Sequence, residues 1–262
     1  TSVRKSVTID WTVRDAVVKY QARWPVAEVV EADVMLRNMS LLTERNRVIN
    51  AGNEVVNARL EIANFRQPVM TLSAFASGTM ENFRQLCLQS PIADAFGGQL
   101  DRVSVTGDAT ASLDLRVPIR DWQSFTFTTE VQTGNAGFRI EGFDAPLTDI
   151  SGNVTIERED IRSQALGATF LGEPVSIELS QAPDSMPAFR VIANAAGSTT
   201  AEALEKELGL PFNDRASGSL DYTARLLFPR GQVDEPAPFT IEIDTDLAGQ
   251  VEERAKSDEG VR

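Results

Sequence analysis

Alternation of apolar and polar side chains is the feature that most constrains the fold of this chain. In ASLDLRVPIRDWQSFTFTTEVQTGNAGFRIEG (residues 111–142), Leu113 and Leu115 alternate with polar residues, and Phe125 and Phe127 repeat the pattern. A period of two residues predicts β-strands with one apolar and one polar face. The chain is therefore expected to form a large sheet whose apolar face needs a cover.

Similar alternating segments recur from one end of the chain to the other. In one of them, Val56, Ala58, Leu60 and Ile62 are predicted to share a face. Turn sequences separate the segments, and VQTGNAGFRI is predicted to be a hairpin because Gly134 and Asn135 tolerate positive φ. About a dozen strands fit the chain, and they should be mostly antiparallel because few helices are available for parallel crossovers.

Two segments have the composition and end signals of helices. TMENFRQLCLQSP (79–91) has Thr79 as a candidate N-cap and places Cys87 on its apolar side. STTAEALEKELGLP (198–211) has Thr199 or Thr200 as its cap, with Gly209 and Pro211 at its end. Cys87 is therefore expected to be a small core residue and not a reactive thiol.

The surroundings of these helices indicate an internal duplication. PVMTLSAFASG (68–78) matches PAFRVIANAAG (187–197), and FGGQLD (96–101) matches ASGSLD (216–221), which pairs Gly98 with Gly218. We expect a first β module at 1–120 with a short helix near 79–90, and a second at 121–247 with a short helix near 199–208. The charged segment 248–262 is predicted to be a disordered tail.

The composition excludes several classes of function. Lys plus Arg number 25 and Asp plus Glu 38, so the formal charge is 25 − 38 = −13. This balance argues against binding to nucleic-acid phosphates or to anionic membrane surfaces. Without histidine and with one cysteine, the chain cannot build His-based triads or Cys-based zinc sites. We predict no enzyme activity, no catalytic residues, no metal site and no cofactor.

Simple geometry limits how the apolar face can be covered. A dozen strands spaced by roughly 4.8 Å form a sheet about 55–60 Å wide. Two helices, each about 10–12 Å across, cover less than half of that width. Exposing ten large apolar side chains would cost on the order of 20 kcal/mol. The sheet could fold into a sandwich, close as a barrel, or form a trough covered by lipid or detergent.

Several stretches resemble the YhdP family of Gram-negative bacteria, relatives of the AsmA and TamB group. They are YQARWPVAEVVEADVMLRN (20–38), SPIADAFGGQLDRVSVTGDATASLDLRVPI (90–119) and LTDISGNVTIEREDIRSQALGATFLGEPVSIEL (147–179). The resemblance covers most of residues 10–247. It implies a long, curved β-sheet trough in the periplasm, an N-terminal inner-membrane anchor missing from this sequence, and a part in moving phospholipid toward the outer membrane. The family has no catalytic residues to carry over.

The prediction is therefore a mostly β protein with an elongated, curved antiparallel β-sheet, a trough, and two short helices. The alternative fold is a β-sandwich. As a segment of a longer protein, it would shield phospholipid acyl chains in an apolar groove. The predicted lining residues are Leu113, Leu115, Val117, Phe125, Phe127, Phe138, Ile140, Ile177, Leu179, Val191, Leu226 and Ile241.

Two other functions stay open at this point. One is a structural or interaction scaffold of the envelope, which would have a closed core, no lipid and a protein partner. The other is a glycan-binding or glycan-active domain, but 13 Phe against 3 Trp and 2 Tyr favour an apolar lining over sugar stacking.

Overall fold

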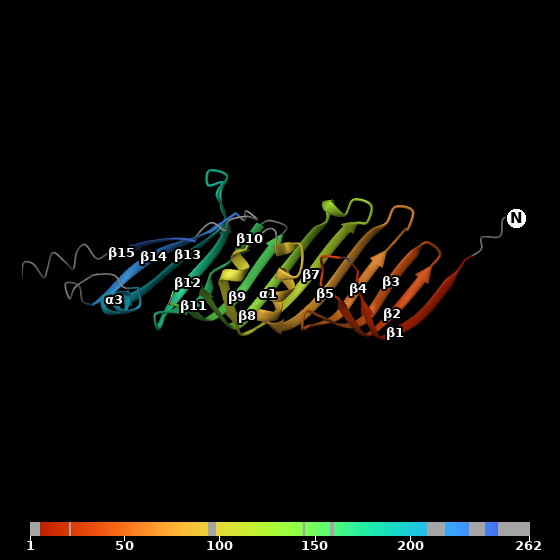
Figure 1. Cartoon of the computed structure of the whole chain (residues 1–262), viewed down its shortest axis with the longest axis horizontal. Helices are drawn as coiled ribbons and strands as arrows, with labels where there is room; N and C mark the ends of the chain where they lie inside the picture. The colour runs from red at the N-terminus through yellow and green to blue at the C-terminus, as the bar shows by residue number, and fades with distance from the viewer. Residues whose placement is uncertain are drawn as a thin grey trace, which may run out of the picture. The chain divides into compact units, whose positions relative to one another are not determined.

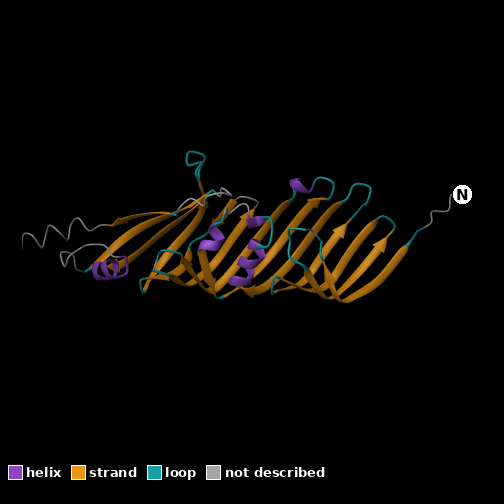
Figure 2. Ribbon diagram, viewed as in Figure 1, coloured by secondary structure: helices purple, strands orange, loops and turns teal. Residues whose placement is uncertain are grey.

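The computed structural model describes residues 6–20, 22–93, 98–143, 145–157, 160–208, 218–230 and 239–245. Strands and short helices make up this part of the chain (Figures 1 and 2). The strands are β1 (Thr8–Val18), β2 (Ala27–Arg37), β3 (Ser40–Asn50), β4 (Asn53–Ile62), β5 (Val69–Thr79), β6 (Val103–Thr106), β7 (Asp108–Pro118), β8 (Thr126–Ile140), β9 (Leu147–Glu157), β10 (Asp160–Ser163), β11 (Leu166–Phe170), β12 (Glu173–Gln181), β13 (Phe189–Thr200), β14 (Ser219–Pro229) and β15 (Thr240–Thr245). The helices are α1 (Met80–Leu88) and α3 (Ala201–Leu208), with 3-10 turns η1 (Gln99–Arg102) and η2 (Trp122–Ser124).

The strands form one antiparallel sheet in the order β1-β2-β3-β4-β5-β7-β8-β9-β11-β12-β13-β14-β15, with β10 beside β9 and β6 beside β8. Among the described strands, β1 pairs only with β2 and β15 only with β14, so hydrogen bonding does not close the sheet. The mostly β, antiparallel prediction is confirmed. No helix of the described residues is long and apolar enough to cross a membrane. The predicted tail at 248–262 lies outside the described residues, as do Gly209 and Pro211.

The chain divides into two compact units. The first unit comprises residues 1–95, 107–133 and 153–160, and the second comprises 96–106, 134–152 and 161–262. Strands β8 and β9 each contribute residues to both units. The division into modules at residue 120 therefore stays a prediction.

Each unit contains the same strand–helix–strand motif. In the first, β5 leads into α1, and Thr79 caps the helix by accepting a hydrogen bond from the Asn82 amide at 3.1 Å. In the second, β13 leads into α3, and Thr200 caps it by accepting from the Ala203 amide at 3.1 Å. Both helices were expected, and of the two candidate caps for the second helix the structure selects Thr200.

In each motif, a glycine with positive φ lies directly before the second strand. The Met80 amide donates to the Gly107 carbonyl at 2.8 Å, and the Ala201 amide donates to the Gly218 carbonyl at 3.4 Å. Both glycines have positive φ, 91° and 102°, and each lies directly before a strand that pairs with the one preceding the helix. The counterpart of Gly218 is therefore Gly107. The predicted match with Gly98 is wrong, because Gly98 begins η1, which lies with β6 between the helix and β7.

Two other local predictions are wrong for reasons of strand register. Residues 131–140 are not a hairpin but part of the continuous strand β8, whose first half pairs with β7 and whose second half pairs with β6. Val56 does not share a face with Leu60, because the β4–β5 register shifts between Val56 and Arg59. Asn57, between them, has φ of 55°, and this bulge reverses the alternation.

A substitution at Gly78 tests the packing between β4 and β5. A Cβ at Gly78 would overlap the Oδ1 atom of buried Asn53 and lie 3.1 Å from its Cγ. We expect Gly78→Ala to lower the free energy of unfolding by about 1–3 kcal/mol. Gly134→Ala is the control, because a Cβ there meets no atom within 4 Å. Urea denaturation measures the unfolding free energy of each variant, and equal values for the two variants would contradict this packing.

Candidate functional site

The first unit presents an apolar face made of rows that run across its strands. One row follows the pairings Ile9–Leu36, Leu36–Leu41, Leu41–Ile62, Ile62–Met70 and Met70–Val117. A second row contains Trp11, Val34, Thr43, Leu60, Leu72, Leu115 and Phe127. Paired residues of an antiparallel sheet point to the same side, so these side chains form one surface across seven strands.

This apolar face is only partly covered. Ala109 and Ala111, at the end of β7 where α1 begins, are buried. Farther along the same strand Leu113, Leu115 and Val117 are only half-buried. On the edge strand, Ile9 and Trp11 are 50% and 43% exposed. In the described part of the first unit α1 is the only α-helix, so most of the face has no helical cover.

The opposite face of the first unit carries charge pairs. Arg14 pairs with Glu31 at 2.7 Å, Arg45 with Asp33 at 2.8 Å and Arg47 with Glu54 at 2.6 Å. Arg59 pairs with Glu44 and, at 3.3 Å, with Glu61. Exposed pairs of this kind add little stability each, but they keep this face hydrated. The first unit is thus amphipathic across its sheet.

The corresponding apolar face of the second unit is covered by its own side chains. Buried residues on β11–β14 fill it, namely Leu166, Ala168, Val175, Ile177, Val191, Ala193, Leu220 and Tyr222. Leu204 of α3, which is 1% exposed, adds to this core. The second unit therefore has an ordinary protein interior.

Aromatic contacts show why this interior is closed. The rings of Phe170 on β11 and Tyr222 on β14 lie 6.1 Å apart, and Phe143 stacks on Phe170 at 6.4 Å. Strands β12 and β13 lie between β11 and β14, whose backbones are about 14 Å apart in a flat sheet. The two rings therefore lean toward each other across β13 and β12 and cover this face. Gly197 makes room, because a Cβ there would lie 2.9 Å from the Tyr222 hydroxyl oxygen.

A second contact joins the first and last strands of the same unit. The guanidinium carbon of Arg102, next to β6, lies 5.1 Å from the ring centroid of Phe239, directly before β15. Phe239 meets Phe228 edge-on at 5.4 Å. Contact between residues so far apart in the strand order requires a curled sheet.

The predicted lining residues therefore lie in two different environments. Five of them belong to the first unit and are half-buried, namely Leu113, Leu115, Val117, Phe125 and Phe127. The rings of Phe125 and Phe127 stack at 6.0 Å. In the second unit, Ile140, Ile177 and Val191 are buried, Phe138, Leu179 and Leu226 half-buried, and Ile241 exposed. That any of them contacts lipid stays a prediction.

The sequence prediction omitted residues of the same face on earlier strands. Trp11, Leu60 and Leu72 are in line with Leu115, and their own period-two segments contained the signal. What was missing is the register that joins these segments into one surface.

Cys87 behaves as expected, since burial raises the pKa of its thiol to about 11 and keeps it protonated at neutral pH.

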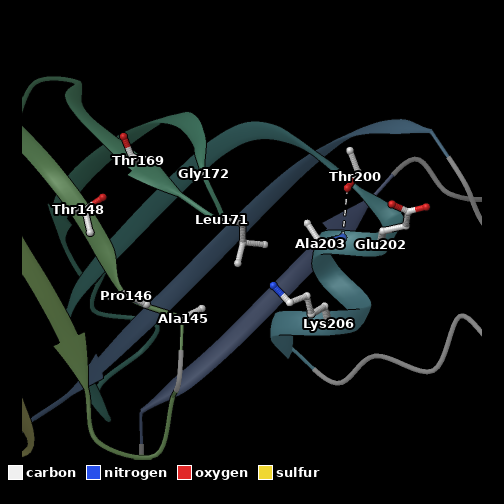
Figure 3. A pocket seen from close by; sticks show the side chains of 10 residues that line it. All are labelled: Ala145, Pro146, Thr148, Thr169, Leu171, Gly172, Thr200, Glu202, Ala203 and Lys206. Atoms are coloured by element: carbon white, nitrogen blue, oxygen red, sulfur yellow. Dashed lines mark hydrogen bonds between the residues drawn. The ribbon is translucent and has the colours of Figure 1, made fainter.

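A separate hollow of about 540 Å³ lies beside α3 in the second unit (Figure 3). Its walls come from the β8–β9 connection, the β11–β12 turn and the helix, and Leu171 projects into it from the turn. The lining mixes three threonines and small apolar groups with Glu202 and Lys206. None of the predicted lining residues contributes to it.

Comparison with known proteins agrees with the resemblance in the sequence. The family described as "YhdP protein" matches residues 2–252. The chain belongs to the YhdP family. It is 23% identical over 239 residues, 90% of its length, to the "Intermembrane phospholipid transporter YhdP" of Escherichia coli (strain K12), and spans 18% of that relative. No solved structure matches the chain.

Charged substitutions distinguish the two environments. Leu115→Glu places a carboxylate on a half-exposed face, and we expect it to cost about 1 kcal/mol of unfolding free energy. Ile177→Glu buries a carboxylate at a position that is 6% exposed, and we expect a loss of about 3 kcal/mol or more. Urea denaturation of each variant measures the difference. A Leu115→Glu protein as unstable as Ile177→Glu would contradict an open face.

Proposed function

We propose that this chain is a non-enzymatic segment of a periplasmic phospholipid transport protein, and that the apolar face of its first unit shields acyl chains. The relative's name gives intermembrane phospholipid transport as that protein's function. Because the chain spans less than a fifth of that relative, transport between membranes, and the inner-membrane anchor, belong to the whole protein.

One observation carries the proposal. A row that is apolar except for Thr43 crosses seven strands of the first unit, and its residues on β7 and β8 are half-buried. Leaving each such side chain in water forgoes up to about 1.5–3 kcal/mol. Acyl chains are apolar and deformable, so they can cover this surface without a preformed pocket.

The same arrangement explains how lipid could move. Leu72, Leu115 and Phe127 of the second row help to line an open hollow of about 370 Å³, and neighbouring positions along the rows are chemically alike. A lipid that steps from one strand to the next exchanges one apolar contact for an equivalent one, so the barrier between positions should be low. The charge pairs on the opposite face keep that side in water.

Site-specific crosslinking tests this proposal. Benzoylphenylalanine replaces Phe127 on the apolar face or, as the matched control, Thr126 on the polar face of the same strand. After irradiation in cells, we expect phospholipid adducts at position 127 and none at 126, measured by mass spectrometry of the purified protein.

Other patterns of adducts would argue against the proposal. Equal lipid adducts at both positions would indicate non-specific contact with membranes. Protein adducts alone at position 127 would favour the alternative, an envelope scaffold whose apolar face binds a protein partner.

A further inference from the structure

One margin of the first unit combines exposed apolar side chains with arginines. It consists of the loops where β2 meets β3, β4 meets β5 and β7 meets β8, at the upper end of these strands in Figure 1. We call this margin the rim. Its backbone is continuous, because the Phe65 amide donates to the Met39 carbonyl at 2.8 Å and the Ile119 amide donates to the Pro68 carbonyl at 2.9 Å.

The apolar side chains of the rim are exposed to solvent. Met39 is 44% exposed, Phe65 36%, Ile119 45% and Trp122 52%. Loop residues are normally polar, so one large apolar side chain or more in each of three neighbouring loops is unusual. They adjoin the end of the apolar face of the sheet, whose last residues there include Leu36, Ile62 and Val117.

Each of these loops contains an arginine or directly follows one. Arg37 ends β2, Arg66 lies between β4 and β5, and Arg120 lies between β7 and β8. All three are exposed, and no carboxylate of the described residues pairs with them. On the polar face, Arg14, Arg45, Arg47 and Arg59 form ion pairs, and Arg116 forms none with the described residues. Arg37, which pairs with Thr8, is on the polar side of β2 but is the last residue of that strand.

The spacing of the rim arginines follows from the sheet. In the strand order, Arg37 and Arg66 are two to three strands apart, and so are Arg66 and Arg120. At about 4.8 Å per strand, this places one guanidinium about every 10–14 Å along the rim. Guanidinium groups bind phosphate through two parallel hydrogen bonds.

The structure assigns the rim as the binding site for the phosphate groups of phospholipids whose acyl chains lie on the apolar face of the first unit. The inference rests on the proposed function and adds a headgroup contact to it. Trp122 and Met39 would then lie at the boundary between acyl chain and headgroup, where amphipathic aromatic side chains are favoured.

Charge favours single lipids over a membrane surface as the occupant. The rim loops with Arg37 hold three arginines and Asp121, a local charge of 3 − 1 = +2, whereas the whole chain carries −13. A membrane plane would meet much of this acidic surface. A single phosphate at the rim is screened from distant charges, because the Debye length is about 8 Å at physiological ionic strength.

The test uses the full chain with all three rim arginines changed to glutamine, R37Q, R66Q and R120Q. The matched control changes three paired arginines of the polar face, R14Q, R47Q and R59Q. The probes are monomeric dihexanoyl phosphatidylglycerol, below its micelle concentration, and dihexanoylglycerol, which lacks the phosphate. We expect the rim variant to bind the phospholipid about tenfold more weakly than wild type, and to bind dihexanoylglycerol with unchanged affinity. We expect the control variant to bind both probes with wild-type affinity.

The remaining outcomes separate this inference from the proposed function. If both probes bind and the rim variant binds the phospholipid as wild type does, the rim inference is wrong and the proposed function stands. If neither probe binds to any variant, the proposed function fails and the rim inference with it. If the rim arginines matter only for binding to phosphatidylglycerol vesicles, the rim contacts a membrane surface and the inference is overturned.

Discussion

The free-energy cost of exposing one apolar sheet face to water is the constraint on which the rest of this structure depends. An antiparallel sheet with period-two alternation has such a face, and the helices of the described residues are too few to cover it. The two units meet the constraint differently. The second curls until Arg102 reaches Phe239, and Phe170 leans toward Tyr222 across the strands between them, so its own side chains exclude water. The first leaves Leu115 and Phe127 half-exposed.

The difference between the units has a physical origin in a few residues. Gly197 lacks the side chain that would keep the Tyr222 ring away from the sheet, and Phe143 and Phe239 extend the contact from outside the strands. In the first unit, the middle of the second row is formed by Leu60, Leu72 and Leu115, which are too short to bridge several strands, and the large aromatic side chains Trp11 and Phe127 lie at its two ends. The shared strand–helix–strand motif, capped by Thr79 and Thr200, shows that both units elaborate one plan.

Local sequence signals predicted much of this fold, and non-local contacts account for most of what they missed. The strands, the two helices and the cap at Thr79 follow from periodicity and end signals within about ten residues. The bulge at Asn57 and the continuation of β8 through Gly134 depend on which strand lies alongside, and a single sequence does not contain that information. The curl of the second unit, which buries Ile177 and Val191, depends on contacts between residues far apart in the chain.

Native mass spectrometry of the purified chain tests the central claim, that phospholipid covers the apolar face of the first unit, most directly. The chain is purified without detergent from a phospholipid-containing host and ionised gently. The account predicts charge states that carry the added mass of one or more phospholipids, and predicts that Leu115→Arg, on the open face, removes them while the protein stays folded. A lipid-free chain that is monomeric and stable would contradict it.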